Sequence, residues 1–134
     1  MVNEATLIES PTRFARRTVA YNAAIPYGTL MKLTTPNTAS ASGAAHDIFG
    51  GICWVEKTNV TDTSDVEIVV ALDGVWAILC SAGAITIGQD VVVSGVNTIT
   101  VFTNEDNEKG EVVGKPQEGG AGSTIINVRV NCQT

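Results

Sequence analysis

The chain has 134 residues and a formal net charge of −6, with 14 acidic and eight basic side chains. That length fits one compact domain, and the acidic balance argues against the basic surface that nucleic-acid binding requires. No apolar run approaches the ~18 residues of a membrane span, and the N-terminus lacks the layout of a secretory signal. We therefore expect no nucleic-acid partner, no membrane insertion and no secretion.

Residue type indicates an all-β fold. Val, Ile and Thr number 17, 11 and 16, whereas Leu numbers only five. Branching at Cβ restricts χ1 and suits a pleated, half-buried surface better than a helix. The 13 glycines stand mostly between apolar runs, where they mark turns. We predict a single small β-barrel domain without helices.

Residues 1–17 differ from the rest of the chain. They contain Pro11 and show no sustained alternation of apolar and polar residues. Such a segment cannot offset its ordering entropy by itself. We therefore predict an extended N-terminal arm over residues 1–17, mobile until it meets a partner, and a β-barrel domain over residues 18–134. The candidate contact residues of this arm are Ala5, Thr6, Leu7, Ile8, Arg13, Phe14, Arg16 and Arg17.

Strand and turn signals alternate through the remainder of the chain. Residues 36–45 are rich in small residues and are predicted to form a loop. The predicted strands cover residues 18–20, 29–33, 48–55, 66–72, 75–80, 91–93, 98–102, 111–113 and 123–131.

Two hairpins are predicted. Asp73 and Gly74 form a pair typical of a tight hairpin turn, so residues 75–80 are expected to run back antiparallel to the strand before them. Residues 95–97 separate two short apolar runs and predict the second hairpin.

A short motif recurs along the chain. The pattern Ala-Ile-x-x-Gly occupies residues 24–28 and again residues 84–88, and each copy precedes a long alternating strand. Two similar β-halves folding into one barrel or clip would explain this repeat. Chance similarity is the alternative, because Ala, Gly and Val are common in this sequence.

The residue types and spacings of known catalytic and metal sites are missing. The single histidine, His46, lies in a predicted surface loop without a nucleophile elbow, a zinc-ligand spacing or a phosphate-binding glycine loop. Residues 104–110 are rich in oxygen side chains, but Lys109 occupies the position where a calcium loop needs glycine. We predict a solvated hairpin tip there, and a protein that is not an enzyme, with no cofactor, no metal and no small-molecule substrate.

The cysteines and tryptophans are predicted to be core residues. Cys53, Cys80 and Cys132 are odd in number and lie in apolar runs, which favours buried free thiols over a disulfide. Trp54 and Trp76 also lie inside apolar runs.

The order of the segments carries a family resemblance. Residues 66–76 read VEIVVALDGVW, residues 81–93 read SAGAITIGQDVVV, and a Val-x-Val strand closes the chain. Over roughly residues 18–131 this order resembles that of the small head-decoration (cement) proteins of tailed bacteriophages. Residues 114–118 read GKPQE where that family usually has small residues, so the resemblance does not support the local strand.

The resemblance implies a β-clip or β-tulip barrel that forms a homotrimer at local three-fold axes of an icosahedral head. Its partner would be the major capsid protein, and it would stabilise the expanded shell from the outer surface of the virion after assembly in the host cytoplasm.

The resemblance also implies that the N-terminal arm reaches onto the capsid. In this chain, Ala5–Ile8 would add a strand to a capsid sheet edge. Phe14 would fill a pocket, and the three arginines of the arm would pair with capsid carboxylates. Deleting residues 2–17 is then expected to leave a folded trimer that no longer decorates heads.

The alternative is a β-barrel adhesin or carbohydrate-binding module on a virion or cell surface. It would need an exposed aromatic cluster, for which Tyr27, Trp54 and Trp76 are the candidates.

Overall fold

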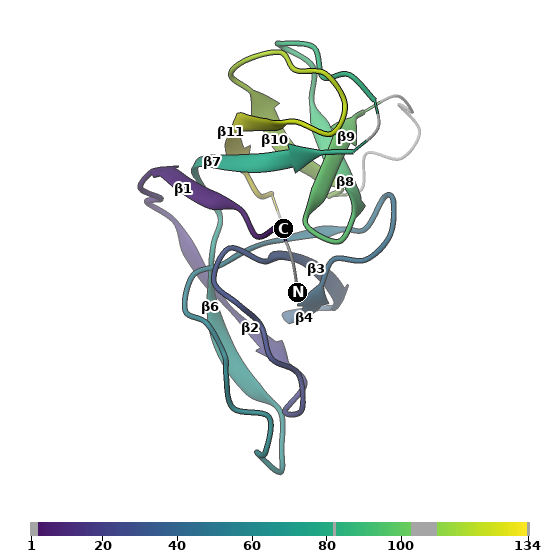
Figure 1. The fold of residues 1–134 in the computed structure, drawn as a ribbon. Helices are drawn as coiled ribbons and strands as arrows, with labels where there is room; N and C mark the ends of the chain where they lie inside the picture. Colours follow the sequence, from purple (N-terminus) through teal and green to yellow (C-terminus); the bar gives the residue numbers. More distant parts are fainter. Residues whose placement is uncertain (1–2, 82, 103–109, 134) are drawn as a thin grey trace.

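The computed structural model describes residues 3–81, 83–102 and 110–133. These residues form strands and no helix, and the strands gather in two lobes stacked on each other (Figure 1). The predicted all-β class is confirmed. The charged segment 104–110, predicted to be a hairpin tip, lies outside the described residues except for Gly110.

The first lobe is a closed five-stranded barrel with the strand order β2-β4-β3-β5-β6. The parallel pairing of β2 with β4 and the antiparallel pairing of β2 with β6 complete the ring. Its strands are β2 (Phe14–Val19), β3 (Leu30–Thr35), β4 (Thr38–Ala41), β5 (Phe49–Cys53) and β6 (Val66–Ala71). Its interior is filled by Val19, Ile25, Met31, Ala39, Cys53, Ile68 and Val70.

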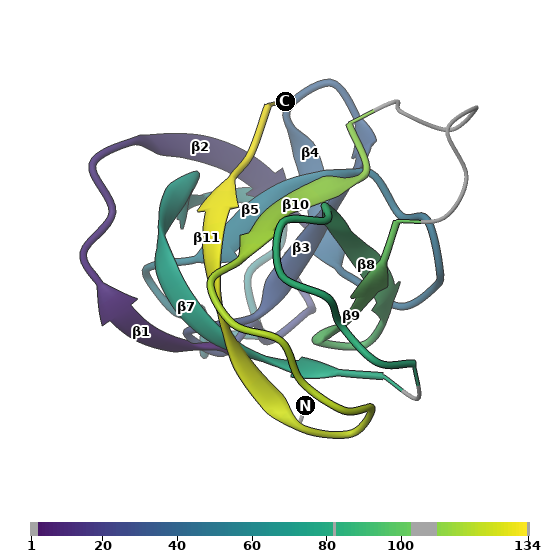
Figure 2. The same cartoon turned by 90° about the horizontal axis from the view of Figure 1, so that it is seen from above.

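The second lobe repeats this architecture and adds one strand. Its order is β1-β7-β11-β10-β8-β9, and a parallel pairing of β7 with β9 closes all but β1 into a ring (Figure 2). Its strands are β1 (Thr6–Glu9), β7 (Asp73–Cys80), β8 (Val91–Gly95), β9 (Thr98–Val101), β10 (Val112–Pro116) and β11 (Ile125–Asn131). Its core includes Trp76, Ile78, Val91, Val93, Ile99, Ile126 and Val128.

The two barrels are copies of one five-strand unit. Strands β2 to β6 correspond in order and pairing to β7 to β11, including a register shift between the second and fourth strands of each copy. Asn37 and Asn97 occupy equivalent hairpin tips with φ of 59° and 54°. The internal repeat predicted from residues 24–28 and 84–88 is therefore present in the fold. Each copy closes its own ring, so the chain holds two barrels where one was expected.

The extended N-terminal arm is not confirmed. Residues 6–9 pair with β7, and residues 14–17 are most of a barrel strand whose whole length pairs with β6. The predicted strand at residues 18–20 is the end of this longer strand. The sequence pattern did not indicate this strand because arginines interrupt the alternation of apolar and polar residues, and one of these arginines, Arg17, is buried.

Two further expectations are wrong. Residues 73–80 do not fold back on β6, since β7 pairs with β1, β9 and β11 in the other lobe. Leu72 connects the two barrels. Gly74 has a φ of 96°, and a Cβ at this position would lie only 2.8 Å from the carbonyl oxygen of Glu9, so glycine allows the two backbones to approach closely. The predicted loop at residues 36–45 also contains a strand, β4, whose small side chains gave no apolar signal. The hairpin at residues 95–97 is confirmed.

Candidate interaction surface

Strand β1 uses one of its edges within the protein. Thr6 lies opposite Ala77 and Leu7 opposite Trp76 in the pairing with β7. Ala5 is buried, and its N–H donates to the Gly28 carbonyl at 2.8 Å. No strand of the described chain pairs with the other edge of β1, and the side chain of Ile8, a residue of this strand, is 51% exposed. The strand therefore keeps an open edge, which is a template for pairing with another chain.

Strand β2 divides its side chains between core and solvent. Ala15, Arg17 and Val19 are turned inward, whereas Phe14 and Arg16 are exposed. The Arg17 Nε–H donates to a barrel carbonyl, that of Gly50, at 3.2 Å. Arg16 faces Glu67 at 3.8 Å with both side chains more than half exposed, an arrangement that contributes little stability.

Arg13 is bound to the protein's own chain. Its guanidinium donates to the side-chain oxygen of Asn131 at 2.8 Å and lies 3.7 Å from an Asp73 oxygen. Asp73 also accepts hydrogen bonds from the N–H and hydroxyl of Thr12 and from the N–H of Arg13. Partial burial alone would raise the pKa of Asp73, but these hydrogen bonds and the Arg13 charge lower it. Of the three arginines expected to face a capsid, Arg16 is the one whose side chain points mainly to solvent.

Aromatic rings gather where the two lobes meet. The Phe14 and Trp54 ring centroids are 5.3 Å apart, and Tyr27 lies 5.8 Å from both Trp54 and Trp76. Trp76 is fully buried, Trp54 partly, and Phe14 and Tyr27 are 45% and 39% exposed. We call Phe14, Tyr27 and Trp54 the aromatic patch. Trp76 is a core residue as predicted, whereas Trp54 borders solvent.

His46 makes a contact between the barrels. Its Nδ1 lies 2.8 Å from the carboxylate of Glu111, which is buried, and its backbone N–H donates to Val93 at 3.1 Å. The predicted surface-loop histidine therefore helps to hold one lobe on the other. Sequence spacing could not reveal this pair, because Glu111 belongs to the second copy of the repeat.

Other chemical predictions concern thiols, metals and membranes. Cys53, Cys80 and Cys132 are free and buried, as predicted. In the described part of the chain, no group of three His, Cys, Asp or Glu side chains could hold a metal ion. Likewise, no helix among residues 3–81, 83–102 and 110–133 could cross a membrane.

Tyr27, Trp54 and Trp76, the aromatic cluster that the carbohydrate-binding alternative requires, do lie together, but the sequence did not indicate that Phe14 joins them. Phe14 was assigned to an arm, and the Trp54 ring on which it packs was assigned to the core. The two residues meet only because β2 closes the first barrel on β6, a long-range pairing. No protein-family model matches the chain, and no curated protein matches it.

Proposed function

We propose that this protein is a capsid decoration protein that binds the outer surface of an expanded phage head as a homotrimer and stabilises that shell. A protein that binds only the expanded state shifts the equilibrium toward it by mass action. The proposal draws on the resemblance in segment order and on one feature of the fold: β1 has an open edge and carries the exposed Ile8.

The capsid contact has two parts. A strand of the major capsid protein pairs with the open edge of β1, so that main-chain hydrogen bonds supply affinity. Ile8 and the aromatic patch fill apolar pockets beside that strand, since aromatic anchors carry much of the energy of protein interfaces. Arg16, exposed on the same strand as Phe14, pairs with a capsid carboxylate. Several copies per oligomer multiply a modest single contact.

Co-sedimentation with expanded and unexpanded heads tests this function. We expect binding to expanded heads only, and a loss of roughly tenfold or more in affinity for Phe14→Ser, equivalent to about 1.4 kcal/mol or more. Ile125→Ser is the matched control, because Ile125 is 67% exposed on β11 in the second lobe. Equal binding of both variants, or no preference between the two kinds of head, contradicts the proposal.

The carbohydrate-binding alternative gains one observation. Tyr27, Trp54 and Trp76, the three aromatics that it requires, do lie together. However, Trp76 is fully buried, so only Tyr27, Trp54 and the neighbouring Phe14 offer ring surface to a sugar. Binding to a glycan array that is lost in Tyr27→Ala would favour this function over capsid binding.

A further inference from the structure

The tandem repeat defines an equivalent surface on each barrel. Leu30, Phe49, Ile52 and Ala71 lie together on the first barrel and correspond, by strand register, to Asp90, Val112, Lys115 and Arg129 on the second. For example, Lys32 pairs with Phe49 as Val92 pairs with Val112. We call these two sets the covered face and the open face.

The covered face is occupied by the second barrel. Its four residues are fully buried and belong to the same core cluster as the interior of that barrel. The tip of the β8–β9 hairpin reaches this face, where the Leu30 N–H donates to the Asn97 side-chain oxygen at 2.9 Å. Ser42 donates from its hydroxyl to Gly95 at 3.1 Å and accepts from the Asn97 N–H at 3.3 Å. Asn97 is fully buried as a result.

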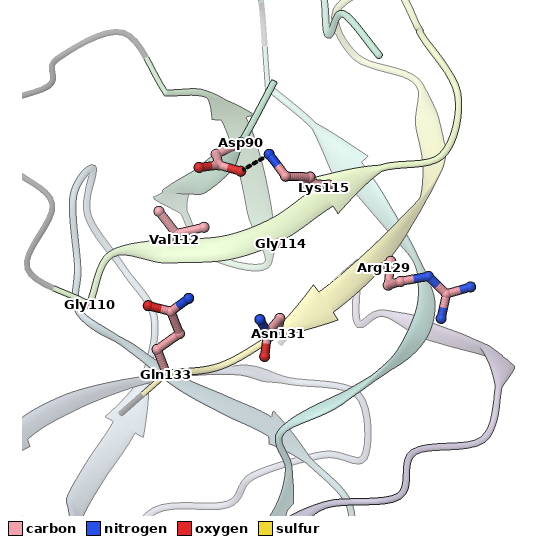
Figure 3. Close-up of a pocket in the computed structure, with 8 residues that line it drawn as sticks. All are labelled: Asp90, Gly110, Val112, Gly114, Lys115, Arg129, Asn131 and Gln133. Carbon is pink, nitrogen blue, oxygen red and sulfur yellow. Dashed lines mark hydrogen bonds and ion pairs between the residues drawn. The ribbon is translucent and has the colours of Figure 1, made fainter. Parts of the chain in front are cut away.

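The open face of the second barrel is a groove. It has a cavity of about 460 Å³, lined by all four open-face residues together with Gly110, Gly114, Asn131 and Gln133 (Figure 3). Where the covered face has Leu30 and Ile52, the groove has Asp90 and Lys115, whose charged atoms are 2.7 Å apart. Where the covered face has Ala71, the groove has Arg129, more than half exposed.

The matching hairpin tip of the first barrel is exposed. Pro36 and Asn37 lie at the tip of the β3–β4 hairpin, and both are exposed. Asn37 has the same left-handed backbone as Asn97, so it presents its side chain from the same kind of turn. The Arg17 Nη1–H donates to the Asn37 side-chain oxygen at 3.4 Å, and an amide oxygen has a second lone pair that can accept another hydrogen bond.

We propose that the β3–β4 hairpin tip of a second copy of this chain docks on the open face, so that copies associate head to tail by repeating the contact between their own two barrels. Asn37 takes the place of Asn97, and the backbone N–H of Asp90 takes the place of that of Leu30. This inference rests on the internal repeat and does not depend on the capsid role.

The charges on the open face suit such a contact. An apolar face like the covered one would be a large exposed hydrophobic patch on a free copy and would promote aggregation. Interfaces between chains that also exist apart carry more polar residues than a permanently buried one. A heterologous contact of this kind forms a ring if its rotation closes; three copies would give a ring of six barrels.

Cysteine cross-linking between two distinguishable chains tests the contact in the absence of heads. Asn37→Cys is placed in an untagged chain and Asp90→Cys in a chain with a mass tag, and the mixture is oxidised. We expect mixed disulfide dimers and few dimers from either chain alone. A mixture of Thr58→Cys with Asp90→Cys is the control, because Thr58 is exposed on a different loop of the same barrel, the one between β5 and β6. The native cysteines are buried and do not compete.

The mass of the untreated protein in solution is the second readout. Light scattering should show association that increases with concentration and is lost in Asp90→Lys, with circular dichroism confirming that this variant is folded. A monomer at all concentrations, dimers of Asn37→Cys with itself, or equal cross-linking of the Thr58→Cys control would each overturn the inference. Head binding is measured separately with the wild-type protein and reports on the proposed function, whereas the cross-linking without heads reports on the contact between copies.

Discussion

Asp73 accepts two hydrogen bonds from Thr12, one from the backbone N–H at 2.7 Å and one from the hydroxyl at 2.6 Å. Thr12 lies between β1 and β2, and Asp73 begins the second barrel directly after the connecting residue Leu72. The carboxylate therefore ties the N-terminal connection to the junction of the two barrels.

Replacing Asp73 should reduce the dependence of the free energy of unfolding on pH in the acidic range. Its pKa is lowered in the folded protein, so its contribution is present above the unfolded value of about 3.9 and is lost as the pH falls through the folded value. We expect Asp73→Ala to lower the free energy of unfolding at pH 7 by about 1–3 kcal/mol. Urea unfolding from pH 7 to pH 2.5 should show the gap to wild type closing on acidification. A constant gap would contradict this role.

Two truncations should distinguish the contributions of β1 and β2 to folding. Deleting residues 2–17 removes β1 and most of β2, which opens the first ring, so we expect no cooperative thermal transition. Deleting residues 2–9 removes the added strand β1 and the buried Ala5 but keeps all of β2 and Thr12, so a cooperative transition at a lower temperature is expected. A fully folded protein lacking residues 2–17 would restore the original expectation of a dispensable arm.

Substitution of Gly114 should be severe for steric reasons. A Cβ at this position would lie 2.0 Å from the backbone oxygen of Arg129, so the β10–β11 pairing would have to shift. We expect Gly114→Ala to cost about 3 kcal/mol or more. Gly43→Ala is the control, since nothing lies within 4 Å of its Cβ position, and it should stay within about 0.5 kcal/mol of wild type. Similar urea midpoints for the two variants would argue against this tight approach.

Asn97 and Asn37 form a matched pair for measuring the contact between the barrels. Replacing either asparagine by alanine removes the same preference for a left-handed backbone. Asn97→Ala also leaves the buried N–H of Leu30 without its acceptor, whereas Asn37→Ala removes only the longer, 3.4 Å hydrogen bond from Arg17 Nη1. We expect Asn97→Ala to be more destabilising than Asn37→Ala by about 1–2 kcal/mol. Chemical denaturation at low protein concentration gives the comparison, and an equal loss would show that the second hairpin does not anchor the lobes.

The three thiols should be unreactive in the folded state. Burial, with a smaller effect of the Glu56 charge, raises the pKa of Cys53 to about 12, and burial also raises the pKa of Cys80. Because the thiolate is the reactive form, an aromatic disulfide reagent at pH 8 should label none of the three before unfolding and all three in denaturant. Rapid labelling of the native protein would mean that a barrel opens locally.

The sequence by itself determined the elements that depend on near neighbours. Alternating apolar residues at 66–72 and 123–131 predicted β6 and β11, because residues two apart share a face of a strand. Residues 95–97 predicted their hairpin, and the recurrence of residues 24–28 at 84–88 predicted a repeated unit.

Only the tertiary structure decided where each strand pairs. Asp73 and Gly74 carry the local signal of a hairpin, yet the chain passes through them into the second barrel, since a closed ring leaves β6 no edge for β7. The contact between the Phe14 and Trp54 rings also depends on strand pairing between residues more than 40 positions apart in the sequence. The equivalent residues Leu30 and Asp90 differ in chemistry because one face is covered by the next barrel and the other meets solvent. No local pattern records that distinction, because it depends on which copy of the unit comes last.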